Sequence, residues 1–130
     1  MKISKNYPKS RAKGVNLACA LMLLLISSSA GANTARIFNL SADEWARPRS
    51  GEMIPQFSPV RAAVAYWGRG SDAIVVIRHP GEDSGELWAA ELRDWLITLG
   101  VPSDYIRLRA GTQAADEISL VVGSREELEQ

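Results

Sequence analysis

The chain has 130 residues, with 15 Lys and Arg, 15 Asp and Glu and one His, so its formal net charge is zero. Five of the 15 basic residues and none of the 15 acidic ones stand before residue 33, so residues 33–130 carry ten Arg, no Lys and every acid. This acidic remainder lacks the basic surface expected of a nucleic-acid-binding protein, and we expect no nucleic-acid partner.

The N-terminal segment has the three parts of a secretory signal peptide. Lys and Arg residues come first, an apolar run from Val15 to Ile26 follows, and small residues end in Ala30-Gly31-Ala32. We expect cleavage after Ala32, with cleavage after Ala30 as the alternative. An uncleaved membrane anchor is less favoured, because the apolar run is shorter than the ~20 residues of a spanning helix. The sequence thus predicts a signal peptide over 1–32, a periplasmic location, and one domain over 33–130 with no membrane span after cleavage.

The single cysteine, Cys19, lies inside the apolar run of the predicted signal. Cleavage would leave a domain without thiols, so neither disulfides nor thiol catalysis would be available to it. We therefore expect its stability to come from packing.

The first half of the domain predicts one strand and two helices. Residues 36–40 form an alternating strand, and Ser41 with Glu44 has the form of a capping box that starts a short helix through Trp45. Residues 48–59 contain several Pro and Gly residues and predict a loop. Pro59 then favours a helix over 60–67, which Gly68 should end.

The second half predicts a buried strand over 73–77 and then the most regular helix of the chain, from about Ser84 to Leu99. A second capping box, Asp83 with Glu86, should start this helix, and Gly100 should end it. Its apolar positions are Leu87, Trp88, Leu92, Trp95, Leu96 and Leu99. Two further strands are predicted over 105–108 and 118–122, followed by an acidic tail over 124–130 that either extends as a short helix or frays.

This order of elements predicts an α/β (α+β) fold. A right-handed crossover through the long helix should place strands 73–77 and 105–108 parallel, either as neighbours or with another strand between them. We expect a small mixed sheet of three to four strands, with helices packed mainly on one face.

The strand end Arg78-His79-Pro80 resembles the Arg-His-Gly signature of the histidine phosphatases, which implies a phosphatase or another hydrolase that uses His79. However, Pro80 replaces the glycine and no second His exists, so we expect His79 to be an exposed loop residue and the protein not to be an enzyme. Glu82, Asp83 and Glu86 could bind a cation, but acids in a first helical turn are better explained as helix caps. We therefore predict no catalytic residue, no metal and no cofactor.

Several side chains remain as a candidate partner surface. Trp88 and Trp95 lie on the apolar stripe of the long helix and should belong to the core. Trp45 and Trp67 lie on elements too short to bury them fully, so they are better placed to contact a partner. The candidate surface consists of Trp45, Arg47, Trp67, Arg78, His79 and Asp83.

Residues 59–122 resemble the OmpA-like peptidoglycan-binding domain in the order of their elements: a helix, a strand with a Gly/Asp loop, a helix closing on Leu99-Gly100-Val101, and two strands. That family holds the cell-wall peptide with an Asp after the strand and an Arg in the helix. Asp83 matches the Asp, whereas Trp88 stands where the Arg should be and the linker and helix are shorter. The resemblance implies a peptidoglycan-binding module as an alternative function.

The amino-acid sequences of two segments resemble those of small exported proteins of unknown function, which are encoded by integrating conjugative elements of proteobacteria. These segments are FNLSADEWARPRSG over 38–51 and GELWAAELRDWL over 85–96. The resemblance implies a non-enzymatic periplasmic accessory of a conjugative type IV secretion apparatus, with protein partners in the cell envelope.

Overall fold

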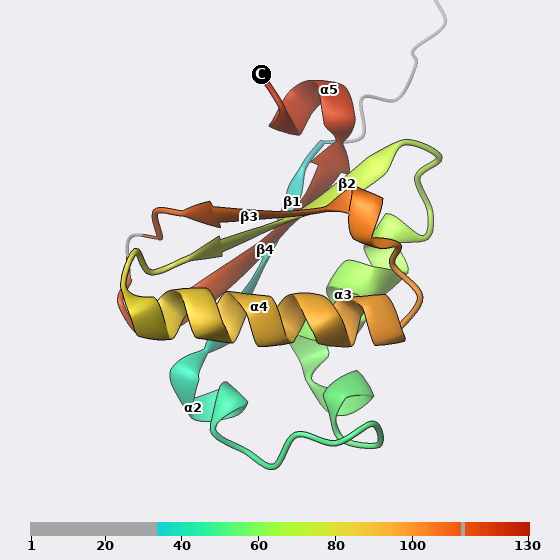
Figure 1. Ribbon diagram of the computed structural model, residues 1–130. Helices are drawn as coiled ribbons and strands as arrows, with labels where there is room; N and C mark the ends of the chain where they lie inside the picture. Colours follow the sequence, from blue (N-terminus) through green and yellow to red (C-terminus); the bar gives the residue numbers. More distant parts are fainter. Residues whose placement is uncertain (1–33, 113) are drawn as a thin grey trace, which may run out of the picture. The chain divides into compact units, whose positions relative to one another are not determined.

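The computed structural model describes residues 34–112 and 114–130 (Figure 1), so the predicted signal peptide over 1–32 lies outside the described residues. Four strands and four α-helices follow one another in the described part of the chain. Their bounds are β1 Arg36–Ser41, α2 Ala42–Trp45, α3 Ser58–Trp67, β2 Ala73–His79, α4 Asp83–Thr98, β3 Ile106–Ala110, β4 Glu117–Ser124 and α5 Arg125–Leu128, with short 3₁₀ turns at Ile54–Gln56 and Ser103–Tyr105.

The strands form one mixed sheet in the order β1-β4-β2-β3. β2 and β3 are parallel, with Val75 opposite Ile106, whereas β4 is antiparallel to both β1 and β2. The predicted α+β class and the parallel pair are therefore confirmed. No strand separates β2 from β3, because they pair directly.

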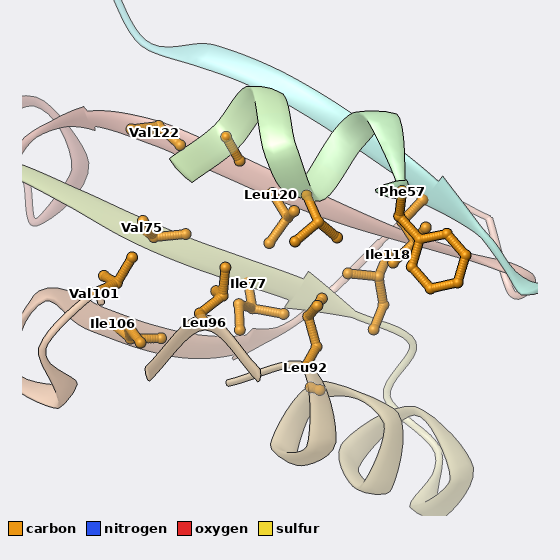
Figure 2. Close-up of a cluster of buried hydrophobic side chains, with 14 of the residues drawn as sticks. Phe57, Val75, Ile77, Leu92, Leu96, Val101, Ile106, Ile118, Leu120 and Val122 are labelled. Carbon is orange, nitrogen blue, oxygen red and sulfur yellow. The ribbon is translucent and has the colours of Figure 1, made fainter. Parts of the chain in front are cut away.

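The main core lies between the sheet and helices α3 and α4. α3 packs on β1 and β4, and α4 packs on β2 and β3, so the two helices share one face of the sheet (Figure 1). Every second residue of each strand faces them. Figure 2 shows the buried side chains that meet there, among them Phe57, Val75, Ile77, Leu92, Leu96, Val101, Ile106, Ile118, Leu120 and Val122.

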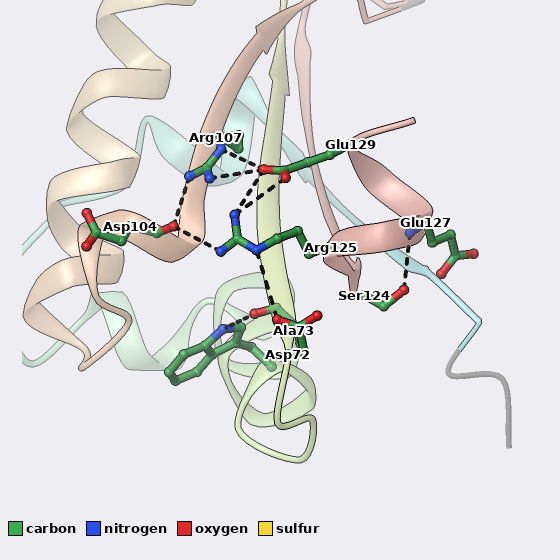
Figure 3. Close-up of polar contacts among 9 residues, drawn as sticks. Asp72, Ala73, Asp104, Arg107, Ser124, Arg125, Glu127 and Glu129 are labelled. Carbon is green, nitrogen blue, oxygen red and sulfur yellow. Dashed lines mark hydrogen bonds and ion pairs between the residues drawn. The ribbon is translucent and has the colours of Figure 1, made fainter. Parts of the chain in front are cut away.

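The opposite face of the sheet is covered at one end by α5, where Leu128 packs against Ile74, Val76 and Val121. Ser124 caps this helix by accepting a hydrogen bond from the Glu127 backbone N–H at 3.2 Å. Ion pairs hold this end of the chain in place (Figure 3): Glu129, just after α5, lies 3.0 Å from Arg107 of β3 and 3.2 Å from Arg125, and Arg125 lies 3.9 Å from Asp72, just before β2. The acidic tail thus takes the helical alternative.

The core-facing side of α4 differs from the predicted apolar stripe. Its buried residues are Gly85, Ala89, Leu92 and Leu96. Trp88, Trp95 and Leu99 pack only partly buried at the margins of the core, and Leu87 is 73% exposed. At 3.6 residues per turn, Leu87 lies roughly 140° around the helix from Leu92, so its inclusion in the stripe was wrong.

The helix ends were predicted with mixed success. The capping box of α2 is confirmed on its Ser side, because Ser41 Oγ accepts a hydrogen bond from the Glu44 N–H. The capping box predicted for α4, Asp83 with Glu86, was wrong, since Glu82 is the N-cap and no side chain caps the helix. The C-terminus of α4 closes as expected on Gly100, whose φ of 100° is favourable only for glycine.

Candidate functional site

A groove of about 600 Å³ lies between α4 and β3. We call it the α4–β3 groove and define it by its lining residues: His79, Asp83, Glu86, Leu87, Ala90 and Leu108. Two of the six predicted surface residues, His79 and Asp83, thus meet at one site. Acidic side chains and exposed apolar side chains share its walls.

Close packing of backbone positions this end of the groove. β2 ends at His79, Pro80 follows, and α4 begins at Asp83. A Cβ atom on Gly85 would clash with the carbonyl oxygen of Pro80, so only glycine lets the first turn of α4 approach the end of β2 so closely. This approach brings the acids of the first helical turn into the same groove as His79.

The structure corrects the expectation that His79 is an exposed loop residue. β2 extends two residues beyond the predicted strand, and the His79 side chain is only 5% exposed because it lies on the face that the helices cover. Its Nδ1 lies 2.8 Å from the Pro80 carbonyl oxygen and donates to it. In the neutral ring this leaves Nε2 as a hydrogen-bond acceptor.

The apolar part of the groove comes from two leucines on different elements. Leu87 of α4 is 73% exposed and Leu108 of β3 is 36% exposed. In the described part of the chain β3 is also an edge strand, since β2 is its one neighbour in the sheet. A free strand edge therefore runs beside exposed apolar side chains, an arrangement that extended peptides use for binding.

Arg78 lies on the opposite face of the sheet from His79, because successive strand residues alternate between faces. Its register partner on β3 is Arg109, and both side chains are exposed. Among the described residues, neither guanidinium has an ion pair or a hydrogen bond. A second depression of about 510 Å³ on this face is lined by Arg78, Asn39, Ser119 and their neighbours.

Trp45 does not form part of an exposed surface, contrary to expectation. It is 7% exposed, and its ring stacks on that of Trp88 with a centroid distance of 6.2 Å and an interplanar angle of 25°. A short helix can bury this tryptophan because Phe57 and α4 cover it from other parts of the chain. Arg47 beside it stays exposed and pairs with Glu44 at 3.3 Å.

Trp67 is half-buried and has a structural contact. Its Nε1 donates a hydrogen bond to the Ala73 carbonyl oxygen at 2.8 Å, and its ring meets that of Tyr105 edge-on at a centroid distance of 5.9 Å. Trp67 therefore ties the end of α3 to the start of β2. It lies outside the α4–β3 groove.

No protein-family model, curated protein or solved structure matches this chain. In residues 34–112 and 114–130, no three His, Cys, Asp or Glu side chains are arranged to hold a metal ion. The same part of the chain contains no helix with the length and apolar character needed to cross a membrane.

The surface predicted from the sequence lacks four of the six groove residues, Glu86, Leu87, Ala90 and Leu108. Helical spacing separates Leu87 from Leu92 by roughly 140°, but only the packing of α4 on the sheet shows that Leu92 is the one that faces the core. Leu108 and Arg109 have no predicted role, because an edge strand cannot be recognised without the order of strands in the sheet.

Proposed function

We propose that the domain is a non-enzymatic interaction protein of the periplasm that binds another protein of the cell envelope. The observation that carries the proposal is the α4–β3 groove, in which exposed Leu87 and Leu108 line the free edge of β3. Exposed apolar side chains grouped in a groove are typical of protein-binding surfaces. The N-terminal signal pattern supports the periplasmic location.

We further propose that the partner belongs to a conjugative type IV secretion apparatus. Support comes from the resemblance of segments 38–51 and 85–96 to the exported proteins of integrating conjugative elements. Both segments contribute to one part of the fold, because Trp45 of the first stacks on Trp88 of the second. Segment 85–96 also supplies three of the groove residues, Glu86, Leu87 and Ala90.

A conjugation assay with two matched variants tests this proposal. Leu87→Glu places a charge in the groove, and Ile97→Glu places the same charge at another exposed position of α4, outside it. A disrupted hot spot costs about 1.4 kcal/mol or more, so Leu87→Glu should lower transfer frequency at least about tenfold. Ile97→Glu should transfer like the wild type at the same periplasmic protein level. Normal transfer after deletion of the gene would contradict the conjugative role.

Cell-wall binding is the second candidate. The observation that favours it is the order α3, β2, α4, β3, β4, which is the order on which the OmpA-like resemblance rests, with Asp83 on the wall of the groove. Trp88, at the position of the family's Arg, is partly buried against the core and stacked on Trp45. Co-sedimentation with insoluble peptidoglycan tests this candidate. Loss of co-sedimentation in Asp83→Ala, together with its retention in Leu87→Glu, would favour cell-wall binding over protein binding.

A further inference from the structure

The outer edge of β3 offers backbone groups to a further strand. The Gly111 N–H donates to the His79 carbonyl oxygen at 2.9 Å, so residue 111 directs its backbone toward β2. Backbone groups of successive residues point to opposite sides of a strand, so Leu108 and Ala110 direct theirs away from β2. By the same alternation the Ile106 carbonyl points outward, and it already accepts a hydrogen bond from the Arg107 guanidinium at 3.1 Å.

The two faces of such an added strand would contact different kinds of side chain. Side chains on the helix-covered face would enter the α4–β3 groove, where Leu87, Ala90 and Leu108 are apolar. Asp83 and Glu86 on the same wall would repel acidic side chains there. The groove therefore favours apolar side chains at alternate positions of the added strand.

The opposite face of the edge is basic. Arg109 lies beside Arg78 in the sheet, and neither has an ion pair in the described part of the chain. Arg107 lies on the same face and forms an ion pair with Glu129, which also pairs with Arg125. Like charges on neighbouring strands are mutually destabilising, and an acidic side chain next to Arg109 would offset this repulsion.

The same charges argue against a second copy of this chain as the occupant. Antiparallel pairing of two β3 strands about Leu108 would set Arg107 of one copy opposite Arg109 of the other. Such a pair of like charges is unfavourable, and no acidic residue occurs in β3 to compensate for it.

Taking the groove as the binding site of the proposed function, we infer that its occupant is an extended segment of a protein partner that adds a strand to β3. Its apolar side chains alternate with acidic ones, the apolar set facing α4 and the acidic set facing Arg109 and Arg107. Backbone hydrogen bonds to the edge supply affinity, and the alternation supplies specificity.

Peptide binding tests this inference on the protein recovered from the periplasm. The probe is a fluorescent peptide of about nine residues, enough to span β3, in which Val and Glu alternate. It should bind saturably by fluorescence anisotropy and slow hydrogen exchange at the Leu108 and Ala110 amides. A peptide with Lys in place of Glu should bind up to about fivefold more weakly for each cross-strand pair. A peptide with the same side chains but alternate backbone nitrogens methylated should lose binding, because it cannot pair with the edge.

Charge reversal gives the matched control. Arg109→Glu should reverse the preference, so that the Lys peptide binds better than the Glu peptide. Arg61→Glu makes the same change in net charge at an exposed residue of α3 and should leave the preference unchanged.

Three results would overturn the inference. The methylated peptide binds as well as the unmethylated one, the Arg109→Glu variant still prefers the Glu peptide over the Lys peptide, or no peptide binds at all. Dimerisation that competes with the Glu peptide would favour a second copy instead. Reduced transfer in Leu87→Glu without binding of the Glu peptide would refute strand addition and leave the proposed function standing. Peptide binding without an effect of gene deletion on transfer would refute the conjugative role alone.

Discussion

At the scale of single residues, burial decides what a substitution at His79 should do. An exposed loop histidine could be removed at little cost, but this side chain packs beneath the helices and donates to the Pro80 carbonyl oxygen. His79→Ala should lower the free energy of unfolding by about 1–3 kcal/mol, through lost packing and a polar group left unpaired. Urea denaturation followed by tryptophan fluorescence measures the change.

The neighbouring residue is the control for this prediction. Arg78 lies on the same strand but is exposed and without a salt bridge among the described residues, so Arg78→Ala should change stability by no more than about 0.5 kcal/mol. Equal denaturation midpoints for the two variants would contradict the burial of His79.

At the scale of elements, α4 presents the same residue type to two environments. Leu92 is fully buried against the sheet, whereas Leu87 is 73% exposed on the groove side. Leu92→Ala should cost about 2–5 kcal/mol through lost burial and the cavity left behind, and Leu87→Ala should cost less than about 0.5 kcal/mol. Denaturant melts of the two variants compare them directly. A mild Leu92→Ala would mean that this face of α4 does not pack on the core.

Element boundaries were predictable where the signal was local. Gly100 ends α4 because the left-handed backbone there needs glycine, and Ser41 caps α2 through a hydrogen bond three residues away. The failed capping box of Asp83 and Glu86 has a different cause. Gly85 allows α4 to start against Pro80, so the position of β2 sets the first turn and Glu82 becomes the N-cap.

At the scale of the whole molecule, the proposed export to the periplasm predicts where the mature chain begins. Protein recovered from the periplasm should begin at Asn33, or at Gly31 if the alternative site is used, because small residues there suit signal peptidase. Intact-mass spectrometry distinguishes these two products from the full-length chain. Full-length protein in the membrane fraction would contradict cleavage and support the anchor alternative.

The candidate surface shows why a site is harder to predict than a fold. Trp45 was expected to be exposed because its helix is short, yet Trp88 and Phe57 reach it from elements far away in the sequence. Arg78 and His79 are adjacent in the chain but lie on opposite faces of the sheet. Of the six predicted residues, only His79 and Asp83 share the α4–β3 groove.

The sequence by itself determined the strands, the two long helices and the α+β class, because hydrophobic periodicity and the Gly and Pro residues act locally. The tertiary structure decided the strand order β1-β4-β2-β3, which leaves β3 at an edge, and the rotation of α4, which turns Leu87 outward. Both depend on contacts between residues distant in the chain. The α4–β3 groove depends on both the strand order and the rotation of α4, since it requires an exposed helix side chain beside a free strand edge.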